Sequence, residues 1–317
     1  MKVGTLLDGI DPSALEATAV AADQLGYESI WRGDHVVIPE NYASSHPRPN
    51  SGSRIAADTP LLDPLVALAF VAAKTTRIRL GTAVYILPLR HPLVAARSVL
   101  SLDQLSTGRF IFGVGAGWLR EEFECLDENF DSRLDRLREA VEVIRVAWGH
   151  PRPSFQGKYY SFSRLGFEPK AASSQYPPIL VGGESSQALR TAAGWGDGWL
   201  GHWQGWEALE SKLALLRELR RQSNRAQSEF DITLAIPSDI SKRDLARLDQ
   251  LGVARVVLVF GAIDTRDEHS RIAALERAAR RLSLATGDQS IARADLGIPL
   301  GPVGQVVDGF ARPWPGC

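Results

Sequence analysis

The fold is decided by one stretch of the chain, in which two short apolar runs flank a helical segment. The first run is Arg77-Ile78-Arg79-Leu80-Gly81-Thr82-Ala83-Val84, and the second is Phe110-Ile111-Phe112-Gly113-Val114. The helix between them is expected over residues 92–105, after Leu87-Pro88-Leu89. The strand ends of such a strand–helix–strand unit open onto loops, where α/β proteins place their sites.

The same alternation extends outward over most of the chain. Strands are expected at residues 3–6, 29–32, 78–83, 110–114, 179–181, 198–201, 230–236 and 255–260. Helices are expected at residues 12–25, from 64 onward, and at 92–105, 133–148, 186–193, 206–221, 241–251 and 269–282. Eight such pairs in 317 residues predict a closed (β/α)8 TIM barrel of the α/β class. An open doubly wound sheet is the alternative, because a single sequence does not show closure.

Two segments interrupt this pattern. Residues 151–178 follow the fourth helix and contain Ser154-Phe155-Gln156-Gly157-Lys158-Tyr159-Tyr160-Ser161-Phe162, which predicts a small hairpin-like insertion. Residues 285–317 have scattered glycine and proline and little periodicity, so they are expected to form a C-terminal tail. The predicted organisation is a barrel domain over residues 1–284 and that tail.

Composition limits the partners and the compartment. The net charge of −1 favours neither nucleic acid nor an anionic membrane, so a small-molecule substrate is expected. The two cysteines, Cys125 and Cys317, form no metal-type cluster and fit a reducing cytoplasm. The N-terminus lacks a secretory apolar segment, and the longest apolar run, residues 65–73, is too short to cross a bilayer.

Candidate chemistry follows the predicted strands. Asp34 and His35 come after the second strand, where an acid can orient an imidazole that titrates near neutrality. A loop aspartate bonded to the backbone beside an exposed histidine is an equally good interpretation. Ala83 and Val84, after the third strand, form either a wall for a flat ring system or ordinary barrel core.

Two glycine-rich turns are further candidates. Gly115, Ala116 and Gly117, followed by Trp118, would let a ligand approach the backbone, or would simply pack over the barrel mouth. After the fifth strand, Gly182, Gly183, Glu184 and Ser185 precede a helix N-terminus, which suits a phosphate. A plain capped helix is the alternative there, and Glu184 would repel a phosphate unless it points away.

Common hydrolase and nucleotide motifs are missing. The sequence has no His-Glu-x-x-His, Cys-x-x-Cys or Gly-x-Ser-x-Gly motif and no Walker-type loop. A metal-dependent sugar isomerase-like barrel is a rival of another class, but only His35 and His202 among six histidines are well placed for it.

Three motifs resemble the luciferase-like monooxygenase superfamily, in the branch of coenzyme F420-dependent oxidoreductases. They are Asp34-His35-Val36-Val37-Ile38-Pro39; the stretch from Gly81 through Leu102-Asp103-Gln104-Leu105-Ser106-Thr107-Gly108-Arg109 to Phe123; and Gly182-Gly183-Glu184-Ser185 with Gly196-Asp197-Gly198-Trp199. The match covers residues 1–205 well, and the later part matches mainly in the order of its elements.

The resemblance implies a TIM barrel that binds F420, or alternatively FMN, at its C-terminal mouth. A non-prolyl cis peptide would be Ala83–Val84, and the phosphate-gripping turn would be Gly182, Gly183, Glu184 and Ser185. The loop of Gly115, Ala116, Gly117 and Trp118 and the side chain of Asp34 would contact the cofactor.

The resemblance also assigns roles beyond cofactor binding. His35 would supply a proton during hydride transfer, whereas FMN would make the enzyme a monooxygenase. Trp118 stands where one related dehydrogenase has an acidic residue, so that enzyme's sugar-phosphate chemistry is not implied. The substrate pocket would be formed by residues 33–60 and the insertion, and a homodimer is expected. A barrel that binds flavin without catalysis is the remaining alternative.

Overall fold

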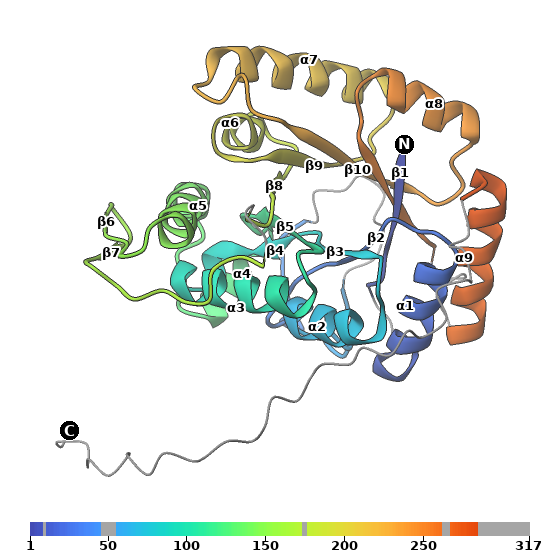
Figure 1. Cartoon of the computed structure of the whole chain (residues 1–317), viewed down its shortest axis with the longest axis horizontal. Coiled ribbons are helices and arrows are strands. Elements are labelled where there is room, and N and C mark those ends of the chain that lie inside the picture. The colour runs from blue at the N-terminus through green and yellow to red at the C-terminus, as the bar shows by residue number, and fades with distance from the viewer. Residues whose placement is uncertain (9–10, 46–54, 173–175, 262–266, 285–317) are drawn as a thin grey trace, which may run out of the picture. The chain divides into compact units, whose positions relative to one another are not determined.

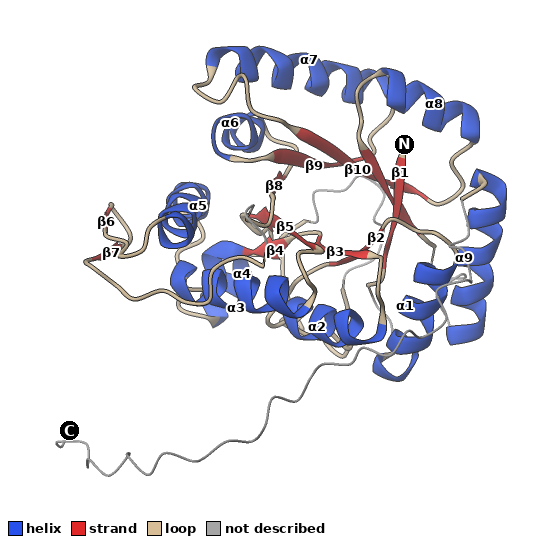
Figure 2. Cartoon of the chain, in the orientation of Figure 1, coloured by secondary structure: helices blue, strands red, loops and turns tan. Residues whose placement is uncertain are grey.

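The computed structural model describes residues 1–8, 11–45, 55–172, 176–261 and 267–284. In this part of the chain, eight parallel strands lie inside a ring of helices (Figures 1 and 2). The strands are β1 (Lys2–Leu6), β2 (Ser29–Arg32), β3 (Arg79–Thr82), β5 (Phe110–Gly115), β8 (Ile179–Gly182), β9 (Gly198–His202), β10 (Asp231–Pro237) and β11 (Arg255–Val259). Pairing of β1 with β11 and of β3 with β5 closes the sheet. The predicted (β/α)8 barrel is therefore confirmed, and the open sheet was wrong.

The helices cover the outside of this barrel and follow the strands in chain order. They are α1 (Leu15–Gln24), α2 (Pro64–Lys74), α3 (Pro92–Leu105), α4 (Arg120–Cys125), α5 (Arg133–Gly149), α6 (Ser186–Trp195), α7 (Trp206–Gln222), α8 (Lys242–Gln250) and α9 (Glu268–Leu282), with 3-10 turns η1 (Pro12–Ala14) and η2 (Leu87–Leu89). Local sequence signals mark the residues at which several of these helices begin. Asp63, for example, accepts hydrogen bonds from the amides of Leu65 and Val66, and Pro64 occupies the first turn of α2.

Side chains fill the inside of the barrel. Trp31 is fully buried there with Ile111, Leu180, Leu200 and Val257. A Cβ atom at Gly81 would lie 2.4 Å from the Trp31 ring, so only glycine leaves room for the indole. Because the interior is packed, a ligand site has to lie at the strand ends.

The predicted insertion is present as an antiparallel pair, β6 (Phe155–Gln156) and β7 (Ser161–Phe162). It is tied to α5, because the carboxylate of Glu139 accepts hydrogen bonds from the amides of Lys158, Tyr159 and Tyr160 at 2.7–3.0 Å. The predicted tail lies outside the described residues, and the domain division stays a prediction.

Three elements were not anticipated: β4 (Tyr85–Ile86), η2 and α4. All three follow β3 or β5, so they belong to the loops at the mouth of the barrel. None of the described helices combines the length and the apolarity that a bilayer span requires.

Candidate active site

A cavity of about 650 Å³ opens at the C-terminal ends of the strands. All twelve residues predicted for the site lie on its wall: Asp34, His35, Ala83, Val84, Gly115, Ala116, Gly117, Trp118, Gly182, Gly183, Glu184 and Ser185. The long loop after β2 adds Ser45, Ile55 and Thr59. The expectation that the insertion shares this wall is not met by its described residues, 151–172 and 176–178.

One wall of the cavity is apolar and is formed by backbone and small side chains at the ends of β3, β5 and β8. The Ala83–Val84 peptide bond is cis, as predicted. The Val84 side chain packs between two glycines, because a Cβ at Gly115 or Gly182 would lie 2.4 Å or 2.5 Å from its methyl groups. The glycines of β5 and β8 thus make room for the segment that follows β3.

His35 is held by a carboxylate that the sequence analysis missed. Its Nδ1 lies 2.8 Å from Oε2 of Glu122, a side chain on α4 with no exposed surface. Oε1 of Glu122 accepts the amide of Val36 at 2.6 Å, which fixes the carboxylate on the His35 loop. Because a carboxylate only accepts hydrogen bonds, Nδ1 carries the shared hydrogen and Nε2 is the nitrogen left for a ligand. The Trp118 ring meets the His35 ring edge-on, with centroids 5.7 Å apart.

The neighbouring Glu121 holds the rest of that loop. Its carboxylate accepts hydrogen bonds from Ala43 N at 2.6 Å, Ser44 N at 3.2 Å and Ser44 Oγ at 2.7 Å. The Ser44 hydroxyl, together with the two amides, lowers the pKa of Glu121 to about 2. The two adjacent glutamates of α4 therefore fix both ends of the segment over residues 35–44.

Asp34 has a different environment from His35. Its two carboxylate oxygens accept hydrogen bonds from Arg90, at 2.6 Å and 2.9 Å, and one also accepts the amide of Ile86 at 2.8 Å. Burial raises the pKa of Asp34, and these hydrogen bonds oppose that effect. Asp34 thus joins the loop after β2 to the loop after β3. Its predicted contact with a cofactor stays a prediction.

The turn after β8 presents backbone amides to the cavity. Ser185 is the N-cap of α6, and its Oγ accepts the amide of Ala188 at 3.1 Å. The first amides of the helix have no carbonyl partner within the helix, so they form an anion site with a favourable dipole. The capped-helix interpretation is confirmed, and the phosphate site at this turn stays a prediction.

Glu184 lines the cavity, but its carboxylate has partners on other elements. Its carboxylate accepts the amide of His202 at 2.7 Å and pairs with Nζ of Lys212. Burial acts to raise the pKa of Glu184, but hydrogen bonds from His202 and Lys212 outweigh burial and hold the pKa below its ordinary value. The repulsion that a free carboxylate would exert on a phosphate is thereby offset.

Sequence reasoning also missed two cations on the wall. Arg133, at the start of α5, donates to the carbonyls of Gly117 and Phe130 and lies over the Phe130 ring, 3.7 Å from its centroid. Arg32, the last residue of β2, is 2% exposed and donates to the carbonyl of Leu7.

Among these missed residues, only Glu122 has a sequence pattern that could have indicated a functional role. It is buried with Leu119 and Phe123 at spacings of i, i+3 and i+4, a helical face on which a carboxylate is out of place.

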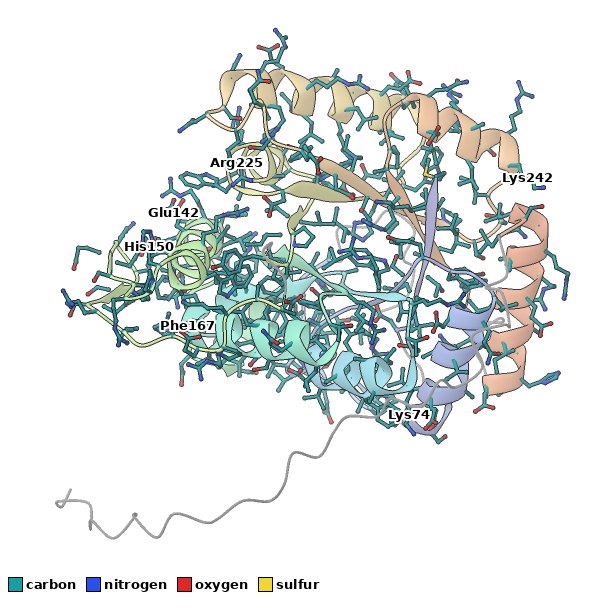
Figure 3. The ribbon with its side chains drawn as sticks, viewed as in Figure 1. Lys74, Glu142, His150, Phe167, Arg225 and Lys242 are labelled. Atoms are coloured by element: carbon teal, nitrogen blue, oxygen red, sulfur yellow. The ribbon has the colours of Figure 1, made fainter. Side chains whose placement is uncertain are left out.

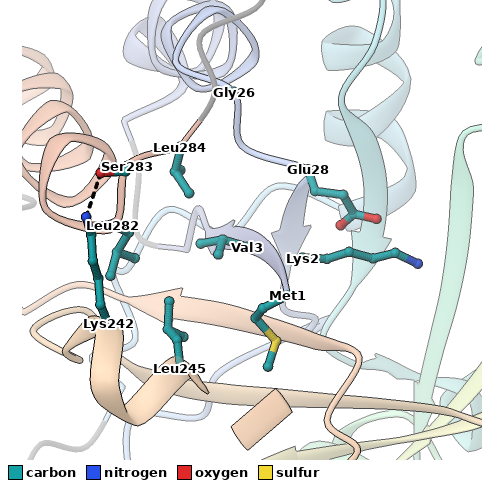
Figure 4. Close-up of a pocket in the computed structure, with 10 residues that line it drawn as sticks. All are labelled: Met1, Lys2, Val3, Gly26, Glu28, Lys242, Leu245, Leu282, Ser283 and Leu284. Carbon is teal, nitrogen blue, oxygen red and sulfur yellow. Dashed lines mark hydrogen bonds between the residues drawn. The ribbon is translucent and has the colours of Figure 1, made fainter. Parts of the chain in front are cut away.

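A second cavity, of about 480 Å³, lies at the opposite ends of the strands, beside Met1 and Lys2 (Figure 4). It contains a hydrogen bond of 2.7 Å from Lys242 Nζ to Ser283 Oγ, and none of the predicted site residues lines it. No three His, Cys, Asp or Glu side chains in the described ranges come together as metal ligands.

The barrel and its mouth define the class of protein. The chain belongs to the luciferase-like monooxygenase family, whose model matches residues 2–310. It is therefore an enzyme of the oxidoreductase and monooxygenase class.

Relatives make the comparison more specific. The chain is 32% identical to an F420-dependent glucose-6-phosphate dehydrogenase of Kineococcus radiotolerans, over 71% of this chain and 63% of that protein. An F420-dependent secondary alcohol dehydrogenase in complex with an F420–acetone adduct matches with a TM-score of 0.70 and 16% identity, over 89% of this chain and 98% of that one. A type II Baeyer-Villiger monooxygenase from Pseudomonas putida, in complex with FMN, matches with a TM-score of 0.57 and 19% identity, over 78% and 71%. The last two likenesses show the shared fold.

Proposed function

We propose that the chain is an F420-dependent oxidoreductase that transfers a hydride to or from a small organic substrate in the cavity at the barrel mouth. The single observation that carries the proposal is the His35–Glu122 pair on the wall of a 650 Å³ cavity whose other walls are glycine-rich. That volume lies in the range of cofactor sites. Relatives at about 30% identity that are F420-dependent by name support the choice of cofactor.

The residues present fit such a cofactor. The amides of Gly183 and Ser185 and the N-terminus of α6 would hold a phosphate, and Arg133 would add positive charge from the start of α5. Ala83, Val84 and Gly115 would line a ring system without projecting polar side chains. Space for it depends on glycine, since a Cβ at Gly115 or Gly182 would already clash with Val84.

When bound, a deazaflavin supplies hydride-transfer chemistry, and the protein supplies binding, orientation and the proton. In a reduction, His35 gives a proton from Nε2 to the substrate oxygen, and the reverse reaction returns it there. Glu122 orients the imidazole through Nδ1 and stabilises its positive charge, because its carboxylate faces the ring at 2.8 Å. Trp118 covers the ring edge and limits access of water.

An FMN-dependent monooxygenase is the second candidate. The observation in its favour is the structural likeness to an FMN-bound monooxygenase, with a TM-score of 0.57. Both candidates use the same cavity, and they differ in the cofactor that it prefers.

Titration of the purified full-length chain with F420 and with FMN, followed by fluorescence quenching, tests the proposal. Tight binding of F420 and weak binding of FMN is the expected result, and the opposite order favours the monooxygenase. Binding with no hydride transfer to or from a panel of alcohols, aldehydes and ketones would instead support a non-catalytic barrel.

We also propose a homodimer formed through α2 and α3. Val66 and Phe70 lie one turn apart on α2 and are 69% and 43% exposed, and Val94 on the adjacent α3 is 63% exposed. Lys74, at the end of α2, lies on the lower edge of the barrel in Figure 3, and its ammonium is 5.6 Å from the Phe70 ring centroid. Exposed apolar side chains gathered on neighbouring helices are typical of an interface.

A further inference from the structure

Arg90 does not line the cavity, but it makes a paired contact with Asp34, which does. Its Nη1 donates to Oδ2 of Asp34 at 2.6 Å, and its Nη2 donates to Oδ1 at 2.9 Å. The Asp34 side chain has no exposed surface, and that of Arg90 is 18% exposed. Two parallel hydrogen bonds between a guanidinium and a carboxylate fix direction as well as distance, so Arg90 holds Asp34 in one orientation.

Two further segments meet the guanidinium of Arg90. Its Nη2 lies 3.6 Å from Oδ2 of Asp63, the N-cap of α2, and its central carbon lies 4.3 Å from the centre of the Tyr85 ring in β4. Tyr85 is buried against Phe112 of β5, with ring centroids 5.6 Å apart. Figure 1 shows β2, β3 and β4 on the side of the barrel that α2 and α3 cover. Arg90 therefore connects the residues after β2, the start of α2 and the segment after β3.

Asp34 passes this constraint to the site in two directions. Along the chain it directly precedes His35, and across the mouth its Oδ2 accepts the amide of Ile86 at 2.8 Å. Ile86 comes two residues after Val84, whose side chain belongs to the apolar wall of the cavity. The pair of Arg90 and Asp34 thus sets where His35 stands relative to that wall.

We propose that Arg90 is a positioning residue of the reaction, which fixes the distance between the proton on His35 and a ring system bound against Val84. This assignment rests on the proposed function, in which the wall at Val84 carries the cofactor ring and His35 supplies the proton. Glu122 orients the imidazole, and Arg90 holds the segment that carries it. Hydride and proton have to reach neighbouring atoms of one substrate, and a displacement of about 1 Å in such a site can lower the rate by about 100-fold.

Arg90→Gln should lower kcat by about 10- to 100-fold, because it leaves Asp34 as a buried carboxylate without its cation. The affinity for F420 should stay within about twofold, since the turn at the start of α6 and Arg133 belong to other parts of the mouth. Turnover is measured with the alcohol of the panel that reacts fastest, and affinity by fluorescence titration of the full-length chain. Arg97→Gln is the matched control, because Arg97 is exposed on α3 and its loss should change neither quantity.

Two further variants separate positioning from folding, and they keep the proposal testable if Arg90→Gln fails to fold. Adding Asp34→Asn to Arg90→Gln removes the buried charge and leaves two amide side chains that can hydrogen-bond to each other. This double variant should recover kcat several-fold over Arg90→Gln. Arg90→Lys keeps the charge but cannot form the paired contact, so its kcat should fall between those of the original chain and Arg90→Gln.

Hydrogen–deuterium exchange of the cofactor-free chain gives a readout that does not depend on activity. In Arg90→Gln, peptides that contain Ile86 should exchange faster, because the amide of Ile86 loses its fixed acceptor on Asp34. The double variant should reverse part of this change. Peptides over residues 182–189, in the turn after β8, should exchange at their original rate.

Unchanged kcat in Arg90→Gln, or a loss of F420 affinity as large as the loss of kcat, would overturn the proposal. Asp63→Asn removes the 3.6 Å contact with Arg90 and keeps a residue that caps α2. A loss of kcat there equal to that in Arg90→Gln would also overturn the proposal, because Arg90 would then act through the start of α2. A chain that binds neither F420 nor FMN would overturn the proposed function, whereas the exchange rate of Ile86 would still decide whether Arg90 holds the segment after β3.

Discussion

Glu122 and His35 are 87 residues apart in the chain, and their side chains meet at 2.8 Å on the wall of the cavity. The pair joins α4 to the loop after β2. Since neither element is part of the barrel sheet, the pair also sets how these two parts of the mouth face each other. Substitutions at the two positions should separate the chemical role of His35 from the positioning role of Glu122.

Replacing His35 by alanine should lower kcat by about 100- to 10,000-fold, the usual contribution of a positioned general acid or base. Cofactor affinity should change only a few-fold, because the imidazole contributes little to the phosphate end of the site. Steady-state turnover and cofactor titration measure the two quantities. His150→Ala is the control, because His150 is exposed at the end of α5, away from the cavity (Figure 3). Unchanged turnover in His35→Ala would remove His35 from the mechanism.

Replacing Glu122 by glutamine should lower kcat by about 10- to 100-fold while leaving KM and cofactor affinity near their original values. Glutamine keeps an oxygen for the Val36 amide but removes the charge that faces the imidazole. Glu122→Asp, which restores the charge on a shorter side chain, should recover part of the loss. Equal losses in both variants, accompanied by weaker cofactor binding, would mean that Glu122 acts only through packing.

The glycines against Val84 should be intolerant of even one methyl group. Gly115→Ala would place a Cβ 2.4 Å from Val84 Cγ2, so we expect weaker cofactor binding and a loss of about 1–3 kcal/mol in the free energy of unfolding. Gly194→Ala is the matched control, because a Cβ there meets nothing within 4 Å and Gly194 lies inside α6. It should raise stability by roughly 0.5–1 kcal/mol, the usual difference between the two residues in a helix. Denaturant unfolding and cofactor titration check both, and an unaffected Gly115→Ala would mean that Val84 has room to move.

The sequence predicted the fold well because its signals are local. The ranges of β2 and α3 were predicted to the residue. The residues predicted for the site line one cavity for a related reason. The carboxyl ends of parallel strands share one face of a barrel, so glycine-rich turns after different strands had to meet there.

What the sequence could not predict were pairings between distant residues. The spacing of Leu119, Glu122 and Phe123 marks Glu122 as a buried carboxylate, but nothing in the sequence identifies its partner His35, which lies on the loop after β2. Arg32 follows Ile30 and Trp31 at the end of β2, and only the closed barrel reveals that its charge is buried. The direction of Glu184 likewise depends on Lys212, which lies 28 residues further along the chain.

Acid should release the loop over residues 43–44 from α4. The pKa of Glu121 is held at about 2, chiefly by the Ser44 hydroxyl, whereas the unfolded chain has a value near 4.5. A lowered carboxyl pKa stabilises the fold fully above pH 4.5, and the effect is lost as the pH falls through about 2. Glu121→Gln should therefore lower Tm at pH 7, and its difference from the original chain should shrink as the pH falls from 4.5 toward 2. Glu124→Gln, an exposed change on the same helix, should show no such trend.

The proposed dimer predicts that a charge on the exposed face of α2 will separate the protomers. Phe70→Glu places a carboxylate among Val66 and the neighbouring side chains, and burying an unpaired charge in an interface is strongly unfavourable. Light scattering after size exclusion should give twice the chain mass for the original protein and the single mass for this variant. Leu105, at the end of α3, is 71% exposed. Leu105→Glu adds the same charge there and shows whether the interface extends to this end of α3. Because the cavity lies at the barrel mouth and is lined by neither Val66 nor Phe70, the monomeric variant should still bind the cofactor. A single chain mass for the original protein would rule out the dimer and would leave the proposed chemistry of the cavity unchanged.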